Sequence, residues 1–412
     1  MAIDNKDKKV LKSSIEREQN EVACSAECEK IKGSKNLNVP PLRFPEFTEE
    51  WKEEQLDNIA TLSKGIGISK EQLSEDGEPC ILYGELYTKY KSEIIKQVES
   101  KTDINGSKLK RSKANDVIIP CSGETAVDIA TARCVPFDNI LFGGDLNVIS
   151  LHQYDGAFMS YQLNGKRKYD IARVAQGVSI VHLYGEHLKA IKTYNPTLPE
   201  QQKIAKLLSL LDDRIDTQNK IIEDLKKLKS AIRKKMFSLL KDEYTESFEI
   251  NQLLDYEQPT AYIVANDEYS TDTSLTPVLT ANKGFILGYT DEKFGIYQKG
   301  ECIIFDDFTM DAKYVSFPFK VKSSAIKILT AKPNVNLRFM FEYLSYWELK
   351  SEGHKRHYIS EIASLVIELP SKERQSIIAS LMTSLNSKLD IEAKTKIRYE
   401  EQKRYLLSQM FI

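Results

Sequence analysis

The residues that most resemble catalytic groups in this sequence form a short acidic stretch. Asp306 and Asp307 are followed by Asp311, Ala312 and Lys313, an order of carboxylates and lysine that resembles the metal site of some nucleases. Such sites usually draw their carboxylates from two separate strands, whereas these acids lie only a few residues apart. We therefore interpret the stretch as a polar loop rather than a metal site.

No other segment carries a recognisable catalytic motif. A phosphate-binding Gly-x-x-x-x-Gly-Lys-Ser/Thr loop is absent, and Gly65 and Gly67 lack the flanking strand and helix of a cofactor loop. The histidines have no serine or cysteine partner in a known triad motif. The six cysteines show neither disulfide-framework nor zinc-site spacing. We therefore expect a chain without catalysis, metal or cofactor of its own.

The composition indicates a globular chain of several domains. Its 412 residues make two or three domains the prior expectation, and 41% hydrophobic residues are enough to build cores. A net charge of −2 is not that of a generally basic nucleic-acid-binding chain, although local basic patches still bind nucleic acid. The sequence has neither a long apolar run nor an apolar stretch near its N-terminus, so we expect a cytoplasmic protein.

Polar, aromatic and basic residues that could contact DNA occur in two parts of the sequence. Lysines and hydroxyl groups suit phosphates, glutamate can accept from cytosine N4, and glutamine or asparagine can pair with adenine. In the first part the candidates are Lys64, Tyr83, Tyr87, Lys89, Lys110, Arg111, Lys113, Ser122, Glu124, Thr125, Lys166, Arg167 and Lys168. In the second part they are Gln258, Tyr262, Asn282, Lys283, Asp306, Asp307, Thr309, Lys313 and Arg356. The basic runs could equally be solvated faces, and the amide residues could be ordinary turn residues.

A long Leu/Ile-rich segment that would position these candidates occurs twice, at an interval of 174 residues. Apolar residues in the first copy recur in alternating steps of four and three, at Ile204, Leu208, Leu211, Ile215, Ile222, Leu225, Ile232 and Met236. Seven of the eight equivalent positions in the second copy are apolar. Polar residues interrupt both copies at matching places, Gln218 and Lys229, then Glu392 and Lys403. This spacing predicts two long helices with a coiled-coil seam.

Each predicted helix follows a β-rich block. The clearest strands are expected at residues 117–120 and 147–151 in the first block, and at 302–305 and 325–329 in the second. Residues 78–82 align with 276–280, and 116–119 align with 301–304. Gly177 and the segment 182–186 align with Gly353 and the segment 357–361. Because the anchors keep their order while the loops differ, the pattern predicts duplicated domains with divergent surfaces.

The segment that opens the first helix resembles a known family. The string PTLPEQQKIA at residues 196–205, followed by the Leu/Ile helix, is similar to the conserved region of type I restriction-modification specificity subunits. The string RFPEF at 43–47 before Trp51, and Gly177 with VHL at 181–183, are similar to that family as well. The second copy departs from the motif, with PSKERQ at residues 370–375.

The resemblance implies an α+β fold with two β-rich target recognition domains, separated by two long antiparallel coiled-coil helices in an internal pseudo-two-fold repeat. The expected divisions are a polar tail at 1–40, a first recognition domain at 41–197, a first spacer helix at 198–240, a second recognition domain at 241–369 and a second spacer helix at 370–412.

The implied function is recognition of a bipartite double-stranded DNA site by a non-catalytic subunit. Such a subunit recruits two modification (methyltransferase) subunits and restriction subunits. The resemblance implies that the complete complex would be an adenine DNA methyltransferase and ATP-dependent endonuclease. Two alternatives remain open from the sequence. One is a stand-alone nuclease or methyltransferase with a coiled-coil dimerisation arm, and the other is a coiled-coil scaffold that does not bind DNA.

Overall fold

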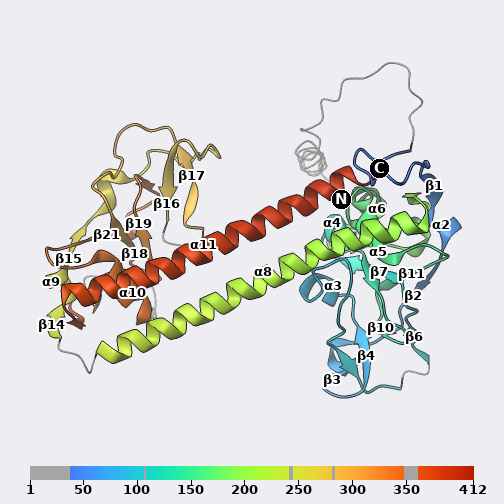
Figure 1. The fold of residues 1–412 in the computed structure, drawn as a ribbon, viewed down its shortest axis with the longest axis horizontal. Helices are drawn as coiled ribbons and strands as arrows, with labels where there is room; N and C mark the ends of the chain where they lie inside the picture. Colours follow the sequence, from blue (N-terminus) through green and yellow to red (C-terminus); the bar gives the residue numbers. More distant parts are fainter. Residues whose placement is uncertain (1–37, 106–107, 241–244, 281–283, 348–360) are drawn as a thin grey trace, which may run out of the picture. The chain divides into compact units, whose positions relative to one another are not determined.

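The computed structural model describes residues 38–105, 108–240, 245–280, 284–347 and 361–412. These residues form two compact units. The first ends at Ser209 and takes in Arg404–Ile412, and the second is Leu210–Lys403. Two long helices, α8 (Leu198–Leu239) and α11 (Lys372–Gln409), each contribute residues to both units (Figure 1). They lie where the apolar seam predicts helices.

The first unit is built on an antiparallel sheet with the order β2-β11-β7-β9. These strands are β2 (Ala60–Lys64), β7 (Asp116–Pro120), β9 (Arg133–Val135) and β11 (Leu146–Leu151). A second sheet contains β3 (Leu73–Ser74), β5 (Lys101–Thr102), β4 (Glu78–Ile81), β10 (Leu141–Phe142) and β6 (Lys110–Arg111). Two short pairs join β1 (Lys52–Gln55) to β13 (Lys192–Asn195) and β8 (Ser122–Gly123) to β12 (Val181–His182). The helices are α2 (Leu56–Ile59), α3 (Glu85–Thr88), α4 (Ala126–Ile129), α5 (Gly156–Asn164), α6 (Lys168–Val174) and α7 (Gly185–Lys189), with the 3-10 turn η1 (Lys70–Gln72).

The second unit repeats the main sheet with the equivalent order β15-β21-β18-β19. These strands are β15 (Leu254–Glu257), β18 (Cys302–Asp306), β19 (Ala312–Val315) and β21 (Ile326–Ala331). A smaller sheet contains β17 (Ile286–Thr290), β16 (Thr276–Leu279) and β20 (Lys320–Val321), and β14 (Glu246–Glu249) pairs with β22 (Val366–Leu369). The helices are α9 (Ile250–Leu253) and α10 (Leu337–Tyr346), with the 3-10 turn η4 (Pro259–Tyr262). The α+β class and the duplicated β-rich domains are therefore confirmed.

The ladders correct one detail of the predicted alignment. Asp116 lies opposite Val135 on β9, and the residue opposite Val315 on β19 is Cys302. Asp116 thus corresponds to Cys302, one residue beyond the Glu301 that the sequence alignment paired with it. A slip of one residue moves every side chain to the other face of a strand. By contrast, the match of 78–82 to 276–280 holds, because Cys80 pairs with the first residue of β10 and Val278 with the first residue of β20, both in parallel. The alignment of Gly353 and 357–361 lies mostly outside the described residues.

Within the second unit, α8 and α11 run antiparallel and the polar interruptions of the seam find partners there. Asp212 forms an ion pair with Lys403 at 2.6 Å, and Gln218 donates a hydrogen bond of 2.5 Å to Glu392. Glu392 follows Gln218 by 174 residues, so each lies against its own equivalent in the repeat. Lys229 pairs with the buried Glu342 of α10 at 3.7 Å. Polar groups inside an apolar seam of this kind specify helix register.

One repeated contact joins each long helix to the β-rich domain before it. Buried Gln201 donates to the carbonyl of Pro196 and accepts from the amide of Asp155, which caps α5. Buried Gln375 donates to the carbonyl of Pro370 and accepts from the amide of Asn336, which caps α10. The segments PEQ at 199–201 and ERQ at 373–375 therefore differ in sequence, but both keep the glutamine that joins the helix to its domain.

The opposite end of each helix packs into a core. Phe411, just beyond α11, is fully buried against Trp51 and Phe158 in the first unit. Phe237, near the end of α8, is buried against Phe339 and Tyr343 of α10 in the second unit. The MF pair that ends each repeat, at residues 236–237 and 410–411, thus has the same role in both copies.

Candidate nucleic-acid interface

A hollow in the first unit brings together several of the predicted contact residues. It has a volume of about 1000 Å³, and its lining includes Tyr83, Tyr87, Ser122 and Glu124. The strand pair β8–β12 brings His182 beside Ser122, although the two are far apart in the sequence. Both tyrosines are more than a third exposed, so their rings are open to a ligand.

Hydrogen bonds hold several lining residues of this hollow in place. The Tyr87 hydroxyl donates to the carbonyl of Ser122 at 3.3 Å, and a Cβ on Gly123 would lie 3.0 Å from that hydroxyl. Burial raises the pKa of Tyr87 well above its usual range, so the phenol remains a protonated donor. Thr125 accepts from the amide of Asp128 and thereby caps α4 at the edge of the hollow.

The lining of the hollow carries groups suited to bases and a cation suited to phosphate. The carboxylates of Glu124, Asp128 and Asp145 share it with the two tyrosine rings and with the exposed Lys91. Carboxylates accept hydrogen bonds from exocyclic amino groups, aromatic rings stack on base faces, and ammonium groups bind phosphate. A second exposed cation is Lys64, whose Nζ lies 5.7 Å from the ring centroid of Tyr184.

Other predicted cations of the first unit are already engaged or lie elsewhere. Lys89 pairs with Glu85 at 2.7 Å, and Arg111 makes a bidentate pair with Glu78 at 2.5 and 2.9 Å. Lys110 and Lys113 line a separate hollow of about 390 Å³. The predicted candidates of the first unit therefore do not form one continuous site.

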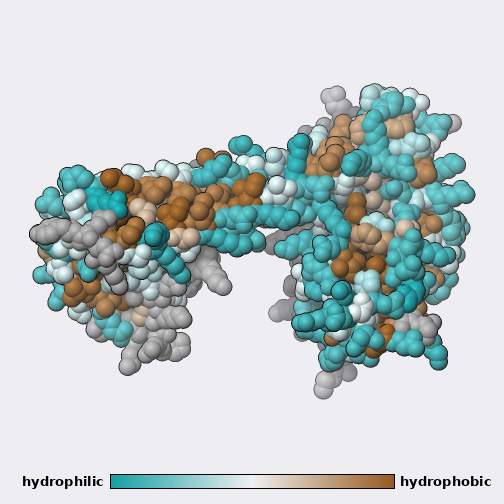
Figure 2. All heavy atoms as spheres, turned by 60° about the horizontal axis from the view of Figure 1, so that its bottom comes forward, coloured by the Kyte–Doolittle hydropathy of each residue, from teal (hydrophilic) through white to brown (hydrophobic). Residues whose placement is uncertain are grey.

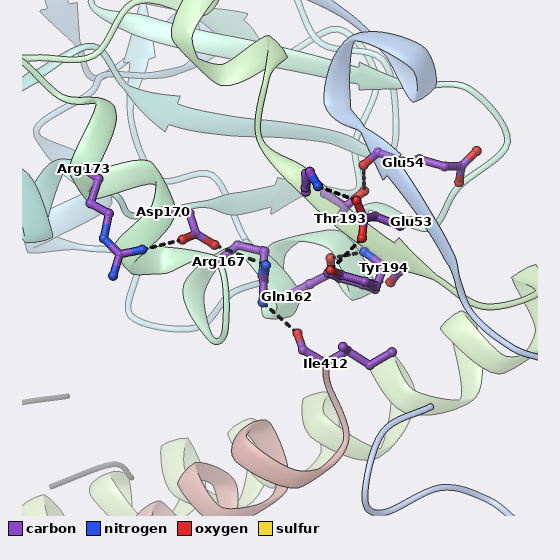
Figure 3. Close-up of polar contacts among 10 residues, drawn as sticks. Glu53, Glu54, Gln162, Arg167, Asp170, Arg173, Thr193, Tyr194 and Ile412 are labelled. Carbon is purple, nitrogen blue, oxygen red and sulfur yellow. Dashed lines mark hydrogen bonds and ion pairs between the residues drawn. The ribbon is translucent and has the colours of Figure 1, made fainter. Parts of the chain in front are cut away.

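The run at residues 166–168 divides into residues with different roles. Arg167 donates to the carbonyl of the C-terminal residue Ile412 at 2.9 Å, pairs with Asp170 at 3.2 Å and lies over the ring of Tyr194 (Figure 3). Its side chain is only 17% exposed. Lys166 is exposed, and Lys168 begins α6. The structure thus places Arg167 in the packing of the C-terminus rather than on an open basic face.

We expect Arg167→Ala to lower the free energy of unfolding of the first unit by about 1–3 kcal/mol, because it removes a charge-assisted hydrogen bond and an aromatic contact. The exposed neighbour provides the control, since Lys166→Ala should change stability by no more than about 0.5 kcal/mol. Denaturant unfolding of both variants measures the difference. Equal stabilities, together with a weaker salt dependence of DNA binding for Arg167→Ala, would instead favour a phosphate contact.

In the second unit, several predicted contact residues are turned inward. Asp306 is buried and accepts from the amides of Phe308 and Thr309, which closes a turn. Asp307 is buried and pairs with the buried Lys327 at 3.4 Å. These acids therefore stabilise the interior, and the prediction that they contact DNA is not retained.

The remaining candidates of the second unit are scattered. Tyr262 is 8% exposed and its hydroxyl donates to Glu257 at 2.7 Å, so little of its ring can meet a ligand. Gln258 is exposed and accepts from Lys327 at 3.2 Å, while Thr309 is exposed and Lys313 half-buried. Asn282, Lys283 and Arg356 lie outside the described residues.

Sequence reasoning missed three exposed apolar side chains on loops. Val178 and Ile180 of the first unit are 83% and 60% exposed, and Phe294 of the second unit is 67% exposed. Hydrophobic residues are normally assigned to the core, so no pattern in the sequence distinguishes them. Ile180 lies on the rim of the large hollow.

The described residues also bear on the alternative sites. Among them, no group of three or more His, Cys, Asp or Glu side chains is arranged to hold a metal ion. Likewise, no helix within the described ranges is long and apolar enough to cross a membrane.

The sequence is similar to known proteins over both halves. A sequence model of the type I restriction modification DNA specificity domain matches residues 48–227 and 243–401. A type I restriction enzyme specificity subunit of Escherichia coli is 39% identical over 178 residues, which cover 39% of this chain and 43% of that protein. A putative type I restriction enzyme specificity subunit of Methanocaldococcus jannaschii is 26% identical over 250 residues, covering 54% of this chain and 58% of that protein. The chain thus matches about half the length of these relatives.

The fold is similar to solved structures over nearly the whole chain. The S subunit of a type I restriction-modification system from M. genitalium superposes with a TM-score of 0.63 at 18% identity, covering 91% of this chain and 99% of that one. A structure described as the basis of complex assembly and conformational transition of the type I R-M system gives a TM-score of 0.53 at 13% identity, covering 90% and 99%. At such identities the likeness concerns the fold.

Proposed function

Because this chain belongs to the type I restriction-modification DNA specificity family, whose sequence model matches both of its halves, we propose that it recognises a bipartite DNA site and has no catalysis of its own. The proposed recognition domains are residues 41–197 and 241–369, with the spacer helices at 198–240 and 370–412 and a polar tail at 1–40. We place the protein in the cytoplasm, where its DNA target lies.

One observation carries this proposal. The same four-stranded order occurs twice, as β2-β11-β7-β9 and as β15-β21-β18-β19, while the surfaces around the two sheets differ. The first carries the hollow with Tyr83 and Glu124, and the second carries the loop with Phe294. A duplicated scaffold with divergent surfaces suits two different half-sites. Neither the stand-alone enzyme nor the coiled-coil scaffold gives a reason for that divergence.

The proposed protein partners are two modification subunits and the restriction subunits. Apolar side chains remain exposed along both long helices, among them Leu228, Ile377, Leu381, Ile391 and Ile397. Figure 2 shows hydrophobic residues gathered along the part of the long helices that adjoins the second unit. Apolar surface of this kind supports docking of further subunits.

The proposal is tested by co-expressing the chain with adenine-methyltransferase subunits and mapping methylated adenines. We expect a motif of two short half-sites with a constant spacer. When residues 41–197 are replaced by the corresponding block of a related subunit, one half-site should change and the other should persist. The reciprocal exchange of residues 241–369 serves as the matched control. A change in both half-sites, or in neither, contradicts the assignment of one domain to each half-site.

A further inference from the structure

Phe294 is the most exposed large hydrophobic side chain in the described part of the second unit, at 67%. It lies in the loop between β17 and β18. An exposed phenylalanine on an unstructured loop would have little meaning, because single apolar residues on a surface are common. This loop, however, is held in place by contacts with a buried side chain.

The anchor is a buried lysine. The side chain of Lys320, on β20, is 1% exposed, and its Nζ donates to the carbonyl oxygen of Phe294 at 2.8 Å. The same ammonium pairs with Glu292 at 2.6 Å and lies 4.8 Å from the Phe294 ring centroid. Glu292 in turn accepts from the amide of Ala265 at 2.9 Å. The loop is therefore tied to two other segments of the unit.

The backbone next to Phe294 is equally specific. Gly295 has a φ of +61°, a conformation that residues with a side chain rarely adopt. A Cβ at this position would lie 2.6 Å from the carbonyl oxygen of Ala261 and 3.2 Å from Lys320 Nζ. The bend that follows Phe294 thus requires a glycine packed on the same lysine.

The exposed ring is an unfavourable feature, because leaving a phenylalanine in water forgoes the stabilisation of burying it. Burying an ammonium group is costly unless it is paired, and the Lys320 ammonium is paired with Glu292 and with the Phe294 carbonyl. The paired cation thus holds the loop in a shape that leaves the ring 67% exposed. Such a combination indicates that the exposed ring is used for contact with a ligand.

The charges on the loop indicate what that ligand is. Glu292 is turned inward, and the hydrogen bond from Lys320 lowers its pKa, so that it stays an ionised partner of the anchor. Lys293, the residue before Phe294, is exposed, as is Asp291. The tip of the loop thus offers an ammonium and an aromatic face together. Phosphates bind the first, and bases unstacked from a duplex bind the second.

We propose that Phe294 is a wedge that inserts between neighbouring bases of the DNA half-site read by the second unit. The proposal rests on the DNA-recognition function proposed above. Insertion of an apolar side chain at a base step partly unstacks the step and kinks the duplex. Phe294 would thereby favour sequences whose steps deform easily, without a hydrogen bond to any base.

The test uses the chain assembled with its modification subunits and a duplex that carries the motif found by methylation mapping. Phe294→Ala should weaken binding by about 5- to 160-fold, the range seen when an aromatic residue that stacks on a base is removed. Phe294→Trp should keep the affinity within about threefold, since the ring is retained. Val366→Ala removes another apolar side chain of the same unit that is 60% exposed, and it should leave binding unchanged.

A second readout locates the wedge. With 2-aminopurine placed at successive steps of the second half-site, the wild-type complex should raise the fluorescence at one step and the Phe294→Ala complex at none. Wild-type affinity in Phe294→Ala, or no rise in fluorescence with the wild type, would overturn the wedge. So would loss of the modification subunits from the Phe294→Ala complex, because it would identify a protein as the ligand. If the wild-type complex binds no DNA at all, the failure lies in the proposed function itself.

Discussion

Replacing Glu200 by alanine is expected to lower the free energy of unfolding of the first unit by about 3–5 kcal/mol. The Glu200 carboxylate is fully buried and accepts two hydrogen bonds of 2.7 Å from Arg43 and one of 3.3 Å from the Trp51 indole. Arg43 is itself only 11% exposed. Removal of the carboxylate leaves a nearly buried guanidinium and an indole N–H without their partner, which costs more than the original pair contributes.

The chain contains a matched control for this variant. Lys203 lies three residues after Glu200 on α8, and Glu46 lies three residues after Arg43. These two residues form an ion pair, and both side chains are 46% exposed. Lys203→Ala therefore breaks an ion pair between the same two segments in water. It should cost no more than about 1 kcal/mol.

Unfolding by urea, followed by fluorescence, compares the two variants. The protein has two tryptophans, so a Trp347→Phe background leaves Trp51 as the reporter of the first unit. A loss below about 1 kcal/mol for Glu200→Ala, or equal losses for both variants, would mean that the buried pair is not the stronger fastening.

Shortening both long helices by one heptad at facing positions is expected to change the spacer of the DNA motif. Because Gln218 contacts Glu392 in an antiparallel pair, the residues that follow Gln218 face those that precede Glu392. Deleting residues 219–225 and 385–391 together therefore keeps the apolar seam in phase. It also leaves the Gln218–Glu392 and Asp212–Lys403 contacts in place.

Each deletion removes about 10 Å of helix at 1.5 Å per residue. Since duplex DNA rises about 3.4 Å per base pair, we expect the preferred spacer to shorten by up to about three base pairs. The measurement is methylation of a library in which the half-sites are constant and the spacer varies.

The single deletion of residues 219–225 provides the control, because it leaves facing segments of unequal length and should abolish methylation. A double deletion that is active and keeps the original spacer would refute the idea that the helices set the distance. Deleting two segments that are 174 residues apart would not shorten the pair evenly. Segments related by the repeat lie on opposite sides of the Gln218–Glu392 contact in the antiparallel pair and do not face each other.

The periodic elements of this protein follow from the order of its residues alone. A seam of apolar residues in steps of three and four predicts a long helix whatever surrounds it, because the period comes from the helix itself. The two helices, α8 and α11, and their order after two β-rich blocks were therefore predictable. Repetition of the seam at a constant interval also predicted the duplication.

Contacts between distant residues depend instead on how the long helices and the two β-rich domains pack. The polar interruptions at Gln218 and Lys403 were visible in the sequence, but their partners Glu392 and Asp212 follow only from the antiparallel pairing. The same holds for Arg167, whose contact with Ile412 joins residues at a separation of 245. Spacing along a chain carries no information about contacts that depend on how distant elements pack.

Strand register and exposure were likewise decided by the fold. Every residue of β7 and β18 is buried, and apart from Asp116 and Asp306 neither strand carries a charged side chain. The apolar residues between them show no alternation that would reveal a slip of one residue. Asp306 and Asp307 resemble surface acids in the sequence, yet backbone amides and Lys327 satisfy them inside the second unit. Phe294 resembles a core residue, yet the buried Lys320 holds it in solvent. The environment of each of these side chains is set by residues far from it in the chain, which is why only the tertiary structure could assign them.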